Sequence, residues 1–589
     1  MNIATKSKML VLSMVVKVMT GVELGVEVEK GPLGRTSLAI LPIILAATFM
    51  QLLDVSIVNV AIPSIQSHLH ASFGSVEAVV AGYQLSFAAT LMTASRLGDV
   101  FGRRRLFLIG MAGFAIASGL CGAAPYVSVL VFGRVVQGFF SGLMFPQVLS
   151  IIQVTFPSSQ RSKVFGIYGA TIGLATIAGP LIGGLLIKAN IANLDWRLIF
   201  YVNVPIGVAA FVGALFLLGE SKSSTSSSVD SMGAFLITAG LVMALYPLIE
   251  GRASSWPNSM VAMLIGSVFV IGGFGVHQYL RYRHGNVTLV SIEAIRTRSL
   301  GVGLILFLIF FLGIAPFFFA FSIFLQEGNG FSPLAAGLTT APFAIGSVLS
   351  SFLTTRTRSK DARILMLAGS LILAISMWLL IRLLYHVGAQ LSGFKLIVPL
   401  FIAGIGVGLF VGPASSLVLA RVPEEAIGSA SGSLSTVQQI GGALGVALIA
   451  IIFFGFLGAN ANQAARAQLP PITAELTSLG LPAPLVKVGT NLFVTCIHDR
   501  ATEKNPSALP HSCIEVGGAI QIAPIAPKVK KQLVSMFFNA AQNAAQGDFL
   551  VSLRDTLSFE IAVFVLTFLL TLALPGWPKD NLDERGIVI

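Results

Sequence analysis

The 589-residue chain has few charged residues, since Asp, Glu, Lys and Arg make up only 11% of it and hydrophobic residues 55%. A soluble protein of this length cannot bury so much apolar surface in one core, so a soluble globular fold is excluded. The formal net charge of +12 does not indicate nucleic acid as a partner. The basic residues stand in short segments between long apolar runs, which is typical of membrane proteins.

The chain also lacks the patterns of several enzyme and metal-binding classes. No ATP-binding loop of the Gly-x-x-x-x-Gly-Lys type occurs, so ATP is not predicted as an energy source. The three cysteines show no zinc-ligand spacing and no Cys–His pattern, and no metal site, catalytic residue or cofactor is predicted. Cys496 and Cys513 lie in a long polar segment. An oxidising exterior would permit a disulfide between them, and two free thiols are the alternative.

Fourteen apolar runs approach the roughly 20 residues that a membrane span needs. Each is predicted to be a helix, because backbone polar groups in lipid must be satisfied within the segment. The runs lie near residues 39–63, 76–95, 105–124, 128–153, 164–187, 198–218, 232–250, 259–280, 299–325, 334–355, 364–384, 396–420, 428–457 and 548–574. The predicted fold is an all-α polytopic membrane protein with the lipid bilayer around it.

Basic residues are distributed unequally between alternate loops. One set of loops carries Arg96, Arg103, Arg104, Arg105, Arg161, Lys163, Lys222, Arg281, Arg283, Arg296, Arg298, Arg356, Arg358, Lys360, Arg363 and Arg421. The short loops of the other set carry only Lys188, Arg197, Arg252 and Lys395. Because basic loops stay in the cytoplasm, the first set of loops and both termini are predicted to be cytoplasmic. The protein is predicted to lie in the cytoplasmic (inner) membrane.

The predicted organisation has two helical bundles and a long external segment. A cytoplasmic tail (1–37) precedes a six-helix bundle (38–220), a linker with two inserted helices (221–298), a second six-helix bundle (299–575) and a cytoplasmic tail (576–589). Within the second bundle, residues 458–547 form the external segment. We expect irregular structure there, because Pro470-Pro471 and scattered alanines occur in it, and one surface helix from Val529 to Ala545.

An internal repeat supports two homologous halves. When the sequence is compared with itself at one constant offset, Gly138 aligns with Gly404 and Gly142 with Gly408. Such a repeat of two halves in the same orientation is found in parallel-repeat transporters. The same offset places Asp54 on Ala320 and Arg134 on Leu400. The ionisable residues are therefore predicted to lie in the first half, which would carry proton chemistry while the second half mainly shapes a pocket.

Asp54 and Arg134 are charged residues inside predicted spans. A charge deep in a bilayer costs roughly 2.5–3.5 kcal/mol on insertion scales, so such residues suggest function. A nearby arginine favours the ionised acid and its withdrawal favours protonation, so Arg134 could tune proton binding at Asp54. The alternatives are a structural acid bonded to Ser56 or a neighbouring helix, and an arginine that reaches the external surface.

Two further segments suggest conformational devices. Asp99, Gly102 and Arg103 lie in a turn between two spans, where Asp99 could pair with Arg103 as a latch; a plain positive-inside loop is the alternative. Gly179, Pro180, Gly183 and Gly184 would allow close helix packing and a bend, and could form a seal against leakage.

Candidates for a substrate cavity share a polar or aromatic side chain inside a predicted span. They are Asn59, Gln137, Phe317, Phe321 and Gln439. The aromatic pair could bind lipophilic or cationic compounds, while helix packing and lipid contact are the alternatives. His68 and His70 have no acid near them in the sequence and are expected to be solvated.

These segments together resemble the major facilitator superfamily and, more narrowly, its fourteen-helix drug:proton antiporter branch, the EmrB/QacA-type multidrug exporters. Leu97 to Arg105 resembles the loop signature between the second and third helices, with Ser95 where glycine is usual and Val100 where arginine is usual. Arg134 with Gln137, and Gly179 with Pro180, resemble the fourth-helix and fifth-helix motifs.

The resemblance implies two six-helix bundles plus two inserted helices, and a proton-coupled exporter of amphipathic or lipophilic compounds such as drugs. It implies no cofactor beyond the proton gradient, and a monomer. Some relatives use a periplasmic adaptor protein, and the sequence leaves open whether this chain has such a partner. Export of an endogenous metabolite, siderophore, lipid or amino acid is the alternative with the same fold. A membrane-embedded transferase and a non-transporting sensor are alternatives from other classes.

Overall fold

The computed structural model describes residues 35–71, 73–222, 230–251, 256–355, 361–387, 391–423, 426–479, 482–503, 510–522 and 527–574. These residues are helical apart from short connections. The predicted cytoplasmic tails lie outside the described residues, except for positions 35–37. Asn59 and Pro180 lie in helices, but their side chains are also outside the described residues.

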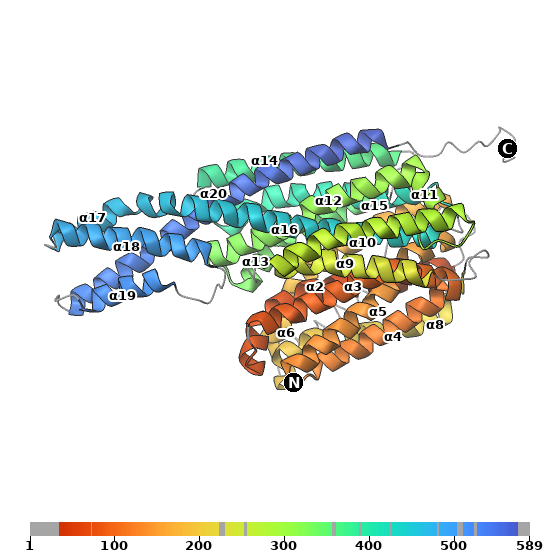
Figure 1. The fold of residues 1–589 in the computed structure, drawn as a ribbon, viewed down its shortest axis with the longest axis horizontal. Coiled ribbons are helices and arrows are strands. Elements are labelled where there is room, and N and C mark those ends of the chain that lie inside the picture. Colours follow the sequence, from red (N-terminus) through yellow and green to blue (C-terminus); the bar gives the residue numbers. More distant parts are fainter. Residues whose placement is uncertain are drawn as a thin grey trace.

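The first half of the chain forms one group of helices, drawn from red to yellow in Figure 1. Its helices are α2 (Arg35–Leu69), α3 (Phe73–Phe101), α4 (Arg103–Gly122), α5 (Val127–Thr155), α6 (Ser158–Ala189), the short α7 (Leu198–Tyr201) and α8 (Asn203–Leu217). Two further helices, α9 (Ser231–Glu250) and α10 (Asn258–Arg283), pack on each other, and α9 contacts both α3 and the second half.

The second half forms the other group, drawn in green and blue (Figure 1). Its helices are α11 (Ile292–Arg296), α12 (Arg298–Ile323), α13 (Pro333–Thr354), α14 (Ala362–Val387), α15 (Ile397–Leu419), α16 (Ile427–Ala467) and α20 (Pro527–Ala573), with a π-turn η3 (Phe324–Gly328) after α12. We call the end of the bundle that carries Arg103–Arg105 and Arg363 the basic end, and the opposite end the far end.

The fourteen predicted spans each coincide with a long helix or, for α7 and α8, a nearly continuous pair. Within the described residues, twelve helical segments are long and apolar enough to cross a membrane. The other two are α3 and α6; α6 contains the shorter apolar stretch Lys163–Ala175. The chain is therefore an all-helical, multi-pass membrane protein.

The far end carries a helical cap, so the expectation of irregular structure at 458–547 is wrong. The cap consists of the extensions of α16 and α20 with α17 (Leu469–Ser478), α18 (Ala483–Thr502) and α19 (His511–Ile522), and it projects beyond the bundle in Figure 1. Pro470 and Pro471 lie in the first turn of α17, where proline is tolerated because those backbone N–H groups have no helical partner. Apolar residues of all five helices share one core, which includes Ile472 and Phe493.

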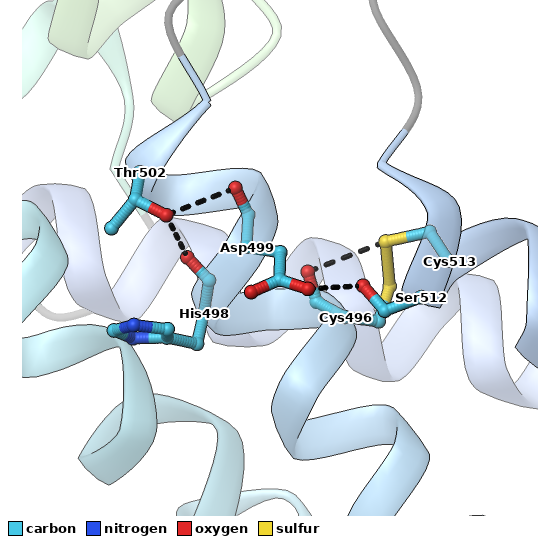
Figure 2. Close-up of a disulfide and its surroundings, with 6 residues drawn as sticks. All are labelled: Cys496, His498, Asp499, Thr502, Ser512 and Cys513. Carbon is cyan, nitrogen blue, oxygen red and sulfur yellow. Dashed lines mark hydrogen bonds between the residues drawn. A yellow bond between two sulfur atoms is a disulfide. The ribbon is translucent and has the colours of Figure 1, made fainter.

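A disulfide between Cys496 and Cys513 ties α18 to α19 within this cap (Figure 2). Beside it, Ser512 Oγ donates a hydrogen bond to Asp499 Oδ2 at 2.6 Å. The two predicted alternatives for these cysteines are thus resolved in favour of pairing, and the cross-link joins two helices separated by the chain segment 503–510.

The two halves repeat one helix pairing. On α5, a Cβ at Gly138 would collide with the Tyr83 carbonyl of α3, so α3 and α5 lie in backbone contact. On α15, a Cβ at Gly404 would collide in the same way with the Phe343 carbonyl of α13. The glycines aligned by the repeat therefore serve the same close packing in both halves.

Candidate proton site and interface between the halves

Asp54 lies near the middle of α2 and is fully buried. Arg134 of α5 donates a hydrogen bond from Nη1 to Asp54 Oδ2. The other carboxylate oxygen, Oδ1, accepts hydrogen bonds from Gln137 Nε2 at 2.9 Å and from Asn203 Nδ2 at 3.1 Å. Three helices, α2, α5 and α8, thus converge on one carboxylate, and the arginine charge offsets the cost of burying it.

Arg134 is held on every side by the first half. Its Nε donates to the Val79 carbonyl at 3.1 Å, and its guanidinium carbon lies 4.1 Å from the centre of the Tyr83 ring. Only 1% of the residue is exposed, so the alternative of an arginine that reaches the surface is wrong. A small shift of α5 relative to α2 would change the distance between this charge and Asp54.

The glycines of α6 set the position of α2 beside this site. A Cβ at Gly179 would lie 2.7 Å from Ser56 Cβ, and one at Gly183 would lie 2.8 Å from Ile57 Cγ1. Ser56 itself donates its hydroxyl to the Leu52 carbonyl at 2.9 Å, so the alternative of an acid bonded to Ser56 is wrong. Bonding of the acid to neighbouring helices, the other part of that alternative, is what α5 and α8 provide. Gly184 faces Leu334 of the second half at an ordinary 3.5 Å.

Nearer the basic end, the same helix α6 packs on the second half. A Cβ at Gly169 would lie 3.3 Å from the backbone nitrogen of Gly412, and one at Gly173 would lie 2.9 Å from Ser347 Cβ. One helix therefore contacts the α2 segment that carries Asp54 and also the neighbouring half. This double contact gives α6 a mechanical connection between the acid and the interface.

The turn between α3 and α4 has the predicted pair. Arg103 Nη2 donates to Asp99 Oδ1 at 2.9 Å, and both residues are buried. Gly102 has a φ of 109°, which favours glycine, and a Cβ there would collide with the Glu220 carboxylate. Glu220 accepts from the backbone N–H of Arg104 at 3.1 Å, so an acid after α8 fixes the turn.

Asp99 also reaches the second half. Its carboxylate fills the space that a side chain on Gly428 would need, at the start of α16. The partial positive charge of a helix N-terminus attracts an acid at that place. Ser95, which stands where glycine is usual, donates its hydroxyl to the Gly428 carbonyl, and Ser150 contacts Ser431 at 2.7 Å. The two halves are thus joined at the basic end.

The candidates for a substrate cavity are not brought together. Phe317 and Phe321 stack at 5.3 Å and are at most 1% exposed, within the largest hydrophobic core. The alternative of helix packing is therefore the one that the geometry favours for both. Gln137 belongs to the Asp54 cluster, Gln439 is half-buried on α16, and the side chain of Asn59 lies outside the described residues.

A polar cluster at the junction of the halves was missed by sequence reasoning. Asp230 caps α9 by accepting from the Gly233 N–H at 3.0 Å, and it also accepts from Gln278 Nε2 at 2.6 Å and contacts His277 Nε2 at 3.1 Å. Burial opposes ionisation of Asp230, but these hydrogen bonds and the charge of Arg281 outweigh it and lower the pKa of the carboxyl. Gln278 in turn accepts from the backbone N–H of Leu289 at 2.7 Å, which joins α10 to the segment before α12.

The sequence shows no acid near His68, but in the structure His68 Nδ1 lies 3.1 Å from Asp195 Oδ2. Asp195 is 127 positions further along the chain, too far to be recognised from spacing. Among the described residues, no group of three or more His, Cys, Asp or Glu side chains could hold a metal ion.

Asn203, Tyr83 and Glu220 are the other site residues that sequence reasoning left out. Asn203 is a polar residue in the apolar run of α8, and that contrast could have marked it. Tyr83 and Glu220 gave no comparable signal, because a tyrosine in a span and an acid after one are common. Their importance follows only from the partners that the fold brings to them.

A multi-pass helical bundle with two repeated halves and a buried acid–arginine pair defines a class of membrane transporters. The family model for the Major Facilitator Superfamily matches residues 44–446, and the chain belongs to this superfamily.

Two relatives and one solved structure show how the chain compares with known members. It is 32% identical over 544 residues to the "Probable actinorhodin transporter" of Streptomyces coelicolor, covering 92% of each chain. It is 30% identical to the "Tetracenomycin C resistance and export protein" of Streptomyces glaucescens, covering 72% of this chain and 77% of that protein. The crystal structure of the human organic anion transporter MFSD10 has a TM-score of 0.51 at 13% identity, over 72% of this chain and 94% of that one; it shows the fold alone.

Proposed function

We propose that the chain exports amphipathic or lipophilic organic compounds of the drug type in exchange for protons. The observation that carries the proposal is the buried Asp54 carboxylate, which accepts hydrogen bonds from Arg134, Gln137 and Asn203. The names of the two Streptomyces relatives, an actinorhodin transporter and a tetracenomycin C resistance and export protein, support a drug-like cargo.

In this proposal the chain transports and does not catalyse, and it lies in the cytoplasmic membrane with its basic end and both termini in the cytoplasm. Loop charge supports that orientation. The halves rock about a central site and expose it to each side in turn. The membrane potential adds roughly 2.3 kcal/mol for each elementary charge moved across 100 mV.

The proton step involves one O–H bond. Asp54 takes a proton from the far side as Arg134 withdraws, because the isolated carboxylate is costly in a low-dielectric site. Return of the guanidinium favours the ionised form, and the proton leaves on the cytoplasmic side. The contacts of α6 with α2 and with the second half supply a route by which rocking could move the two charges relative to each other.

Proteoliposomes with an imposed pH gradient test this function. The wild-type chain should move at least one compound from a panel of ethidium, tetraphenylphosphonium, actinorhodin and tetracenomycin C. Asp54→Asn should abolish gradient-driven movement, while Asp195→Asn, which removes an acid at the far end, should keep it. Equal gradient-driven rates in Asp54→Asn and wild type would contradict the proton role. No movement of any panel compound by the wild type would contradict the cargo class.

A further inference from the structure

A second carboxyl lies deep inside the molecule, on the helix that ends the second half. Glu560 of α20 is 0% exposed, and both of its carboxylate oxygens are buried without a hydrogen-bond partner among the described residues. The residues one turn before and after it, Leu557 and Phe564, belong to the largest hydrophobic core. The expectation that ionisable residues lie in the first half alone is therefore wrong.

No charged group of the neighbouring helices compensates Glu560. Along its length α20 packs on the membrane-crossing helices α12, α14 and α16. Residues 299–323 of α12 and 427–465 of α16 include no Asp, Glu, Lys, Arg, His or Tyr. The ionisable side chains of α14 are engaged or exposed elsewhere.

On α14, Arg363 donates to the Leu572 carbonyl, which is about 18 Å along α20 from Glu560 at 1.5 Å per residue. Arg382 is exposed and lies 5.3 Å from the Trp378 ring. Tyr385 and His386 are exposed at the far end of the same helix. None of these four is a partner of Glu560 in the described ion pairs and hydrogen bonds.

The remaining charged groups near α20 are also accounted for. Arg554 and Asp555 of α20 pair with each other at 3.3 Å. Glu327 of η3 is exposed. The helices α17, α18 and α19 pack on the part of α20 that lies in the cap. Since an ionised carboxylate without a partner is costly in such surroundings, the neutral acid is the favoured form of Glu560.

A row of buried polar side chains lies between Glu560 and the far end. Asp548, Ser552 and Thr556 precede it at intervals of four residues, which places all four on one face of α20. Ser552 Oγ lies 3.4 Å from Asp548 Oδ1, and Thr556 Oγ1 donates to the Ser552 carbonyl at 2.7 Å. The first of them, Asp548, follows directly on the residues of α20 that belong to the cap core.

Toward the basic end this row is interrupted by apolar side chains. Val563 and Phe564 press on α12, where a Cβ at Gly313 would lie 3.0 Å from Val563 Cγ1 and 3.1 Å from Phe564. The Phe564 ring also lies 6.3 Å from that of Phe310. The row is therefore polar on the far side of Glu560, while on the other side Val563 and Phe564 separate the acid from the buried Thr567 and Thr571.

We propose that Glu560 is a second proton-binding site, so that both halves carry a proton in each transport cycle. This deepens the proposed function and rests on it. The carboxylate binds one proton that arrives from the far end past Asp548, Ser552 and Thr556. It holds the proton as the neutral acid in the present conformation. The same O–H bond breaks when the contact of Phe564 with α12 opens and water from the basic end reaches the group.

Infrared difference spectroscopy on the purified full-length chain in lipid tests the protonation without any cargo. Wild type should show the C=O stretching band of a buried carboxylic acid, and Glu560→Gln should lose it. Glu515→Gln, which removes an exposed acid of the cap, should keep the band. Glu560→Asp keeps a carboxyl and should shift the band. This variant provides the test if Glu560→Gln does not fold. A band unchanged in both Glu560 variants would overturn the proposal.

The number of protons exchanged in each transport cycle tests whether Glu560 binds and releases a proton during transport. The panel compound that wild type moves fastest is loaded into proteoliposomes, and the pH gradient that just stops its movement gives the number of protons exchanged. Glu560→Gln should exchange one proton fewer than wild type, and an unchanged number would overturn the assignment. Loss of coupling in Asp54→Asn concerns the first site, so failures of the two proposals are distinguishable.

Discussion

Asp54 in the first half and Glu560 in the second are both fully buried carboxyls on membrane-crossing helices, and their surroundings differ. Asp54 accepts three hydrogen bonds from side chains, one of them from a guanidinium. Glu560 accepts none from the described residues. The first carboxylate is paired with a cation, while the second has no partner in the described part of the chain and favours a bound proton. One movement of the helices could therefore change the surroundings of the two carboxyls in different ways.

The repeat makes this difference sharper. The positions that correspond to Asp54 and Arg134 are Ala320 on α12 and Leu400 on α15, and each is 1% exposed. An apolar pair thus stands where the first half has an ion pair. The buried acid of the second half lies on another helix, α20, and pairs with no arginine of the described residues. The two halves thus share a close helix packing and differ in their buried charged groups.

The largest expected effect comes from breaking the ion pair of the first half. Arg134→Ala leaves Asp54 buried without its cation and should lower the free energy of unfolding by about 3–5 kcal/mol. Asp54→Asn combined with Arg134→Gln removes both charges and should retain most of the stability. Chemical denaturation in detergent measures the difference. Glu560→Gln, which removes no ion pair, is the matched comparison, and an equal loss in that variant would contradict the contrast between the two acids.

A smaller effect is expected from the glycines of α6. Gly179→Ala pushes a methyl group into Ser56 and the backbone of Ile57 and should cost about 1–3 kcal/mol of stability, as overpacking does. Gly184→Ala meets Leu334 at an ordinary distance and should cost less than about 0.5 kcal/mol. Thermal unfolding of the two variants, compared side by side, separates packing beside Asp54 from packing between the halves. Equal losses would show that α6 does not position α2 in the way described.

The smallest effect is expected at the junction of the halves. Asp230→Asn replaces charged hydrogen bonds by neutral ones and should cost about 1 kcal/mol at neutral pH. Because the folded state lowers the pKa of Asp230, its contribution is present above the ordinary aspartate pKa of about 3.9 and is lost as the pH falls through the lower folded value. Stability curves of wild type and variant should therefore converge in acid. A gap that stays constant with pH would contradict this.

The sequence was sufficient for the helices and insufficient for most contacts. Apolar runs located all fourteen spans, since burial in lipid leaves the backbone little choice. Asp54, Arg134, Asp99 and Arg103 were found because charge inside or beside a span is costly. The cap was misread, because its prolines and alanines resemble those of loops.

Glu560 was passed over because strongly apolar residues follow it to the end of the span, so the run was interpreted as lipid-embedded packing. Its lack of a partner is a property of four helices together, and no local pattern encodes it. The role of Glu220 at the turn depends likewise on the distance between α3 and the end of α8. Periodicity predicts which residues are buried, but the partners of a buried group come from the tertiary arrangement.

The continuity of α16 and α20 has a mechanical consequence. With 41 and 47 residues, these helices form rods roughly 60 and 70 Å long. Each begins or ends in the second half and runs unbroken into the cap, where the disulfide fastens the shorter helices together (Figures 1 and 2). In the proposed rocking movement the second half tilts, and the cap would move with it because the two helices are continuous. Each turnover would thus be visible outside the membrane as a sweep of the cap.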